Sequence, residues 1–146
     1  NVSSLPDHVA ITDPTTAKQR WRLVTAPARH FLNTTFTEAP FSLRLEKQPD
    51  LMVHPKDCLA LGVKNGDLVK IGNTRGELIL PVKEYDGLQQ GTLVCESIWP
   101  NNAFAGNVGI NALTSAEPGL PHGGAVFHDT SVWLQPYTES QPLFGA

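Results

Sequence analysis

The chain has 146 residues, a length typical of one soluble domain, with 40% hydrophobic and only 17% charged residues. Its net charge of −3, from 11 basic and 14 acidic side chains, excludes the basic surface that binding of a nucleic-acid polymer requires. No apolar run approaches the roughly 18 residues that a membrane span needs. The 12 glycines and 12 prolines predict many turns and few long helices, so the composition favours a mostly β domain.

The first predicted strand covers residues 21–25, an apolar β-prone run that Pro27 stops. Before it, residues 1–20 show neither hydrophobic period, so we interpret them as a linker or an arm from a preceding domain. The sequence begins with Asn1, and we expect a processed product or a piece of a longer chain. The ordered domain is expected over residues 21–146.

Residues 26–42 mix polar and aromatic side chains without a period and are expected to form a structured loop. A short strand is then predicted over 51–53, followed by a short helix. Pro55 suits the first turn of this helix and Gly62 suits the position just after its end.

A hairpin follows, with strands over 67–71 and 77–83 joined by residues 73–76. In its second strand, Leu78, Leu80 and Val82 recur with period 2, which predicts that they share one buried face. A further apolar strand is predicted over residues 92–98.

Residues 99–131 are rich in Asn, Gly and Pro and interrupt the strand pattern until a last predicted strand over 132–135. A loop of this length inside one domain is more often functional than idle. Because it has few charges and many amide donors, it favours a large, neutral to anionic, hydrogen-bonding ligand.

The common catalytic and metal-binding motifs are missing from the sequence. It contains no glycine-rich phosphate loop and no Gly-x-Ser-x-Gly elbow. His122 and His128 lack a third metal ligand at suitable spacing, and Ser131, His128 and Asp129 are too close in sequence for a catalytic triad. Cys58 and Cys95 lack zinc-site spacing; a disulfide is possible, but two buried free thiols are the commoner state. The sequence therefore assigns this segment no catalytic residue and no metal ligand.

Two constellations could bind a ligand. In the loop after the first strand, Arg29 could neutralise a phosphate, and Asn33 and Thr34 could hydrogen-bond polar groups. The alternative is a capped turn with a solvated arginine. The second constellation runs from Trp99 through Asn111 to Asp129, whose alternative is a surface loop anchored by its tryptophan.

The order of these segments resembles a known domain. The resemblance is carried by LMVHP at 51–55 with Asp57, LGVKNGD at 61–67, TRG at 74–76, Gly91 with Leu93-Val94, and NALT at 111–114. Over residues 21–136 the chain is similar to the C-terminal molybdopterin-dinucleotide-binding domain of the dimethyl-sulfoxide-reductase family of molybdenum and tungsten oxidoreductases. One departure is Thr25-Ala26-Pro27, where many members carry Thr-Gly-Arg.

The resemblance implies a six-stranded double-psi β-barrel of the aspartate-decarboxylase-like type, with short helices and long loops. It also implies that the chain holds a bis(molybdopterin guanine dinucleotide) cofactor against the preceding catalytic domains of the same polypeptide. The cofactor would carry the molybdenum or tungsten, and any iron–sulfur cluster would lie elsewhere in the parent oxidoreductase. The segment alone would bind the cofactor and would not catalyse.

Carried over by position, the resemblance implies cofactor contacts on two sides of one site, with Asn111 as the main pterin contact. The residues are Arg29, His30, Asn33 and Thr34 on the first side, and Trp99, Asn101, Asn111, His128 and Asp129 on the second.

Two other functions remain open at this stage. The chain could be a small separate barrel subunit of the kind found in formylmethanofuran dehydrogenases, or a protein-interaction barrel. The uncharged loop over 99–131 argues against the interaction barrel. The substrate of the parent enzyme is left open, and a cytoplasmic location is favoured over a periplasmic one.

Overall fold

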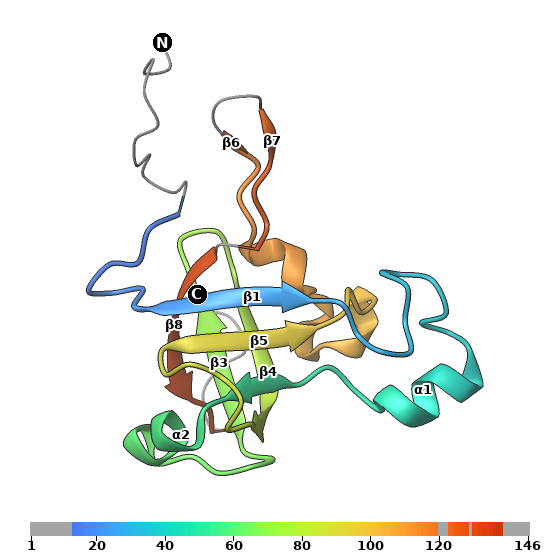
Figure 1. Ribbon diagram of the computed structural model, residues 1–146, viewed down its shortest axis with the longest axis horizontal. Coiled ribbons are helices and arrows are strands. Elements are labelled where there is room, and N and C mark those ends of the chain that lie inside the picture. The colour runs from blue at the N-terminus through green and yellow to red at the C-terminus, as the bar shows by residue number, and fades with distance from the viewer. Residues whose placement is uncertain (1–12, 120–122, 129, 139–146) are drawn as a thin grey trace.

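A computed structural model describes residues 13–119, 123–128 and 130–138. Six strands close into a barrel in the order β1-β5-β2-β4-β3-β8 (Figure 1). They are β1 (Trp21–Ala26), β2 (Leu51–Val53), β3 (Leu68–Gly72), β4 (Glu77–Glu84), β5 (Thr92–Glu96) and β8 (Thr130–Pro136). The predicted mostly β, six-stranded barrel is confirmed.

The barrel consists of two equivalent sets of three strands, with β1, β5 and β8 in the first set and β4, β2 and β3 in the second. In the first set β1 pairs in parallel with β5, and in the second β4 pairs in parallel with β2. β2 and β5 pair with each other in antiparallel fashion, as do β3 and β8. β3 is antiparallel to β4 in the same way that β8 is antiparallel to β1. Exchanging β1 with β4, β5 with β2, and β8 with β3 leaves every pairing unchanged, as a double-psi barrel requires.

The inward faces of the strands build one hydrophobic core. Leu78, Leu80 and Val82 are all buried, so the predicted period-2 face of β4 is confirmed. Side chains from the other barrel strands meet them there, including Leu23, Leu51, Ile71, Leu93 and Val132. The largest contribution to stability comes from this apolar burial.

The helix α2 (Pro55–Leu61) has the termini that the sequence predicted. His54 caps its start, because His54 Nδ1 accepts a hydrogen bond from Lys56 N at 3.0 Å. Gly62 ends it at φ 69°, a left-handed conformation that glycine adopts without steric cost. The buried Asp57 accepts a hydrogen bond from Gly91 N at 2.8 Å and so fixes the helix to the turn before β5.

A second helix, α1 (Pro40–Glu46), was not predicted. Phe41, Leu43 and Leu45 are exposed, and the only buried residue of α1 is Ser42. The helix thus lacks the continuous apolar stripe from which an amphipathic helix is recognised. Within the described residues, no helix has the length and apolar character to cross a membrane.

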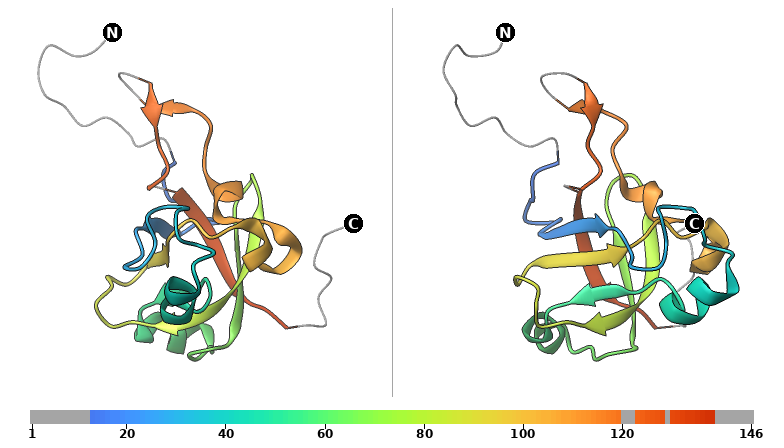
Figure 2. Two further views of the ribbon diagram at one scale, coloured as in Figure 1. Left: turned by 90° about the vertical axis from the view of Figure 1, so that its right-hand side faces the viewer. Right: turned by 45° about the vertical axis from the view of Figure 1, so that its right-hand side comes forward.

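The segment between β5 and β8 is not the irregular loop that was expected. Its described residues form three short 3₁₀ turns, η1 (Asn101–Ala103), η2 (Ala105–Asn107) and η3 (Ile110–Leu113). It also contains a two-stranded hairpin of β6 (Pro118–Gly119) and β7 (Gly124–Ala125), which projects from the barrel in both views of Figure 2. The side chains of Phe104, Ile110 and Leu113 are buried and hold the 3₁₀ turns against the core.

Neither Cys58 nor Cys95 forms a disulfide, which confirms the prediction of two buried thiols. Burial raises the pKa of the Cys95 thiol to about 12, so at pH 8 it carries almost no reactive thiolate. We expect the native protein to show no reaction with Ellman's reagent at pH 8, and two equivalents of thiol after unfolding in guanidinium. Rapid labelling of the native protein would contradict this burial.

Candidate functional site

A pocket of about 550 Å³ lies at the carboxyl ends of β1 and β5. These strands run in parallel with Ala26 opposite Glu96, so the chain leaves both strands at the same edge of the barrel. The η3 turn and the segment after β7 supply the remaining walls. The lining residues are Thr25, Ala26, Pro27, Asn33, Ser97, Ile98, Asn111, Thr114, Ser115, Ala125, Val126, Phe127 and His128.

Asn33 and Ser97 form a linked part of this lining. Ser97 Oγ donates a hydrogen bond to the Asn33 carbonyl oxygen at 3.2 Å, and Ser97 N donates to the Ala26 carbonyl oxygen at 2.7 Å. Both Asn33 and Ser97 have positive φ, 52° and 69° respectively. Left-handed backbone costs free energy in a serine and is concentrated at functional sites. The two hydrogen bonds of Ser97 connect the loop after β1 to the end of β5.

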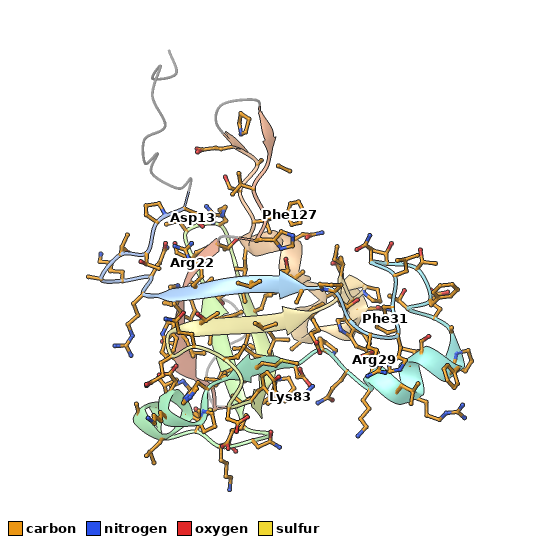
Figure 3. All side chains as sticks on the ribbon, in the orientation of Figure 1. Asp13, Arg22, Arg29, Phe31, Lys83 and Phe127 are labelled. Atoms are coloured by element: carbon orange, nitrogen blue, oxygen red, sulfur yellow. The ribbon has the colours of Figure 1, made fainter. Side chains whose placement is uncertain are left out.

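His128 presents one ring nitrogen to the protein. Its Nδ1 lies 2.8 Å from the Thr25 carbonyl oxygen, which can only accept, so Nδ1 carries the proton in this contact. In the neutral imidazole, Nε2 then offers a lone pair to a ligand. The Phe127 ring lies 4.2 Å from the His128 ring, centroid to centroid, at the base of the projecting hairpin (Figure 3).

Asn111 lies in the η3 turn, on the wall formed by that turn. Its backbone oxygen accepts hydrogen bonds from Thr114 N at 3.2 Å and from Thr114 Oγ1 at 2.9 Å. Within the described ranges its side-chain amide has no protein partner, and the residue is exposed. The amide can therefore offer two donor hydrogens and one acceptor oxygen to a ligand.

The chemistry of the pocket is polar and uncharged. None of its described lining residues is Asp, Glu, Lys or Arg, and amides, hydroxyls and one imidazole alternate with Ile98, Val126 and Phe127. Its volume falls within the range of about 300–1,000 Å³ typical of small-molecule sites. A flat heterocycle with alternating donors and acceptors, such as a pterin or a purine, fits this lining.

The structure brings together three of the residues predicted as cofactor contacts. Asn33, Asn111 and His128 all line the pocket. Thr34 follows Asn33 in an exposed tight turn between Leu32 and Thr35 but does not belong to the lining. Asp129 lies outside the described residues.

Arg29 and His30 lie outside the pocket lining, beyond the end of β1 and close to α1, as the position of Arg29 in Figure 3 shows. Arg29 is exposed. His30 is bound by Glu46, whose Oε1 lies 2.8 Å from His30 Nδ1 and 2.7 Å from His30 N.

Burial, together with the charges of Glu46 and Asp50, raises the pKa of the nearby Glu96, against an opposing effect of Lys83.

Trp99 and Asn101 also lie away from the lining. Trp99 is 5% exposed, packs edge-on against Phe31 at 4.7 Å between ring centroids, and donates from Nε1 to the Glu96 carbonyl oxygen at 3.2 Å. Through these contacts Trp99 anchors the segment after β5 to the core, which is the alternative to a ligand contact. Asn101 is exposed in η1.

Several polar residues of the pocket were not singled out from the sequence, namely Thr25, Ser97, Thr114 and Ser115. The sequence predicts only a strand at Thr25 and only a family motif at Thr114. Ser97 was included in the strand over 92–98, and no local pattern signals its left-handed backbone. No group of three or more His, Cys, Asp or Glu side chains within the described ranges could hold a metal ion.

Three comparisons with known proteins bear on this site. Residues 21–131 match the family described as "Molydopterin dinucleotide binding domain". The probable oxidoreductase YoaE of Bacillus subtilis is 31% identical over 77% of this chain and 16% of its own length. A putative catalytic subunit of dimethyl sulfoxide reductase from Halobacterium salinarum is 27% identical over 69% of this chain and 12% of its own length.

Among solved structures, the chain resembles acetylene hydratase from Pelobacter acetylenicus, with a TM-score of 0.67 and 16% identity. The match covers 82% of this chain and 18% of the hydratase, and it shows the fold. The chain thus spans less than a fifth of the length of each of these relatives.

Proposed function

The chain belongs to the molybdopterin dinucleotide binding domain family, and from this premise we propose that it is the cofactor-binding domain of a larger oxidoreductase. The cofactor is a molybdopterin guanine dinucleotide. When bound, this group supplies the metal-centred redox chemistry, and the domain supplies binding and orientation.

The observation that carries the proposal is the uncharged, amide-lined pocket at the ends of β1 and β5. Asn111 presents on the η3 wall a side-chain amide that has no partner among the described residues, and His128 presents Nε2 on the wall after β7. Such groups can match the donor and acceptor pattern of a pterin or guanine edge without burying an unpaired charge. We assign the contacts with the heterocycle to Asn33, Asn111 and His128.

The partner that we propose is the remainder of a longer polypeptide, containing the catalytic domains. Its expected docking surface includes residues 32–45, where Leu32 is 66%, Phe36 56% and Phe41 63% exposed. Large apolar side chains that are left exposed along one segment are candidates for contact with another domain. The short coverage of the relatives supports the same proposal.

The test is the composition of the native protein, isolated from its source with an antibody against this domain. We expect a chain several times longer than 146 residues that contains molybdenum or tungsten together with guanine nucleotide. A native chain of about this length, free of metal and nucleotide, would refute the proposal and favour the protein-interaction barrel.

A further inference from the structure

The segment before the barrel and the β3–β4 hairpin meet next to the η3 wall of the pocket. We infer that Asp13 and Arg75 are positioning residues that hold this wall in place, and that residues 13–20 therefore act on the cofactor site. The inference rests on the proposed function, because the η3 wall affects the cofactor only if the pocket binds it.

Arg75 connects the two segments through different nitrogens of one guanidinium group. Its Nε donates to the Leu113 carbonyl oxygen at 2.8 Å, and its Nη2 donates to Asp13 Oδ2 at 2.5 Å. Leu113 is fully buried and is the last residue of η3, between the pocket residues Asn111 and Thr114. The position of the carbonyl is therefore fixed from the outside by a charged donor, whose hydrogen bonds are stronger than neutral ones.

The Asp13 carboxylate also bonds to the start of β8, the strand that follows the pocket residue His128 in the chain. It accepts from Ser131 N at 3.0 Å and from Ser131 Oγ at 3.3 Å, three residues after His128. The Asp13 backbone oxygen accepts in turn from Arg22 of β1 at 2.9 Å, and Figure 3 shows the two residues side by side. One carboxylate outside the barrel thus joins the start of β8 to the hairpin that holds η3.

The β3–β4 hairpin that carries Arg75 is itself bonded to η3 and packs closely against it. Asn73 Oδ1 accepts from Arg75 N at 2.9 Å, and Asn73 Nδ2 donates to the same Leu113 oxygen at 2.8 Å. A Cβ atom on Gly76 would lie 3.1 Å from the Ala112 oxygen, so hairpin and η3 are in close contact.

The ion pair is partly shielded from solvent. The Asp13 side chain is 16% exposed and that of Arg75 is 29% exposed, so the pair is screened less than one on an open surface. A lysine at position 75 could keep the charge, but its single nitrogen lacks the fixed fork with which arginine reaches Leu113 and Asp13 at once.

The experiment measures amide hydrogen exchange in the 146-residue chain and in its Asp13→Asn and Arg75→Lys variants. The reporters are Ala112 N, bonded to the Gly109 oxygen, and Thr114 N, bonded to the Asn111 oxygen. We expect exchange at both to accelerate about tenfold in each variant, the equivalent of losing one charged hydrogen bond. Exchange at Val82 N, which bonds to the Asp67 oxygen on the barrel, should not change.

A matched control removes a different ion pair. Lys83→Gln abolishes the pair in which Lys83 Nζ lies 3.6 Å from Asp50 Oδ2, away from Asp13 (Figure 3). This control should leave exchange at Ala112 and Thr114 as in the unmodified chain. A second readout is the dissociation constant of 6-hydroxymethylpterin, which we expect to rise about tenfold in Asp13→Asn and Arg75→Lys and to stay constant in the control.

Unchanged exchange at Ala112 and Thr114 in Arg75→Lys would overturn the inference, since the guanidinium contacts with Leu113 and Asp13 would then not be what holds η3 in place. Acceleration that includes Val82 equally would also overturn it, because the residues would then stabilise the whole barrel. If the unmodified chain bound no pterin while the local acceleration was still seen, the proposed pocket ligand would fail and the coupling of Asp13 to η3 would stand.

Discussion

Replacement of Leu80 by alanine is expected to lower the free energy of unfolding by about 2–5 kcal/mol. Leu80 is 1% exposed on β4, opposite Val69 of β3, and belongs to the single core of the barrel. Truncation removes buried methyl groups and leaves a cavity that the closed barrel can fill only by distorting its pairings. Since domains of this size are stable by only about 5–15 kcal/mol, the variant should unfold at a clearly lower denaturant concentration.

The measurement is urea unfolding followed by tryptophan fluorescence, with Leu59→Ala as the matched control. Leu59 lies on α2 and is 83% exposed, so the same truncation there should change the free energy of unfolding by no more than about 0.5 kcal/mol. Equal unfolding midpoints for Leu80→Ala and the unmodified chain would refute the assignment of Leu80 to the core.

Replacement of Asn111 by leucine is expected to weaken binding of the pterin cofactor by about 10- to 100-fold. Leucine has nearly the shape of asparagine but neither donates nor accepts, so polar atoms of the ligand would be buried without partners, at a cost of about 1–3 kcal/mol. The fold should be unaffected, because Asn111 is exposed and its structural hydrogen bonds use its backbone oxygen.

Two measurements test this substitution: the molybdenum and guanine-nucleotide content of the full-length protein, and the dissociation constant of 6-hydroxymethylpterin for the 146-residue chain. The control is Asn102→Leu, the same replacement at an exposed position of η1 outside the pocket lining. Cofactor content and pterin affinity that remained normal in Asn111→Leu would show that the heterocycle binds elsewhere.

The elements that the sequence predicted well are those whose signal is local. The alternation of Leu78, Leu80 and Val82 was sufficient for β4, because residues two apart in a strand share a face whatever the neighbouring strands are. The ends of α2 followed from Pro55 and Gly62 for a similar reason. The family resemblance, confirmed by the match over residues 21–131, depended on the order of several such local segments.

The helix α1 was missed because its apolar residues do not follow a helical period. Phe41, Leu43 and Leu45 alternate as they would in a strand, yet all three are exposed on a helix that buries only Ser42. The docking of another domain that we propose would cover these exposed side chains. The sequence pattern of the segment carries no information about such a partner.

Sequence alone therefore determined the fold class, the main strands and the state of the cysteines, and the family resemblance supplied a longer set of candidate cofactor contacts. Only the tertiary structure decided that Asn33, Asn111 and His128 share one cavity, because the parallel pairing of β1 and β5 brings distant segments to one edge. The same holds for the left-handed Ser97 and for the contact of Asp13 with Arg75. Periodicity and turn chemistry act over a few residues, whereas these contacts exist only once the barrel has closed.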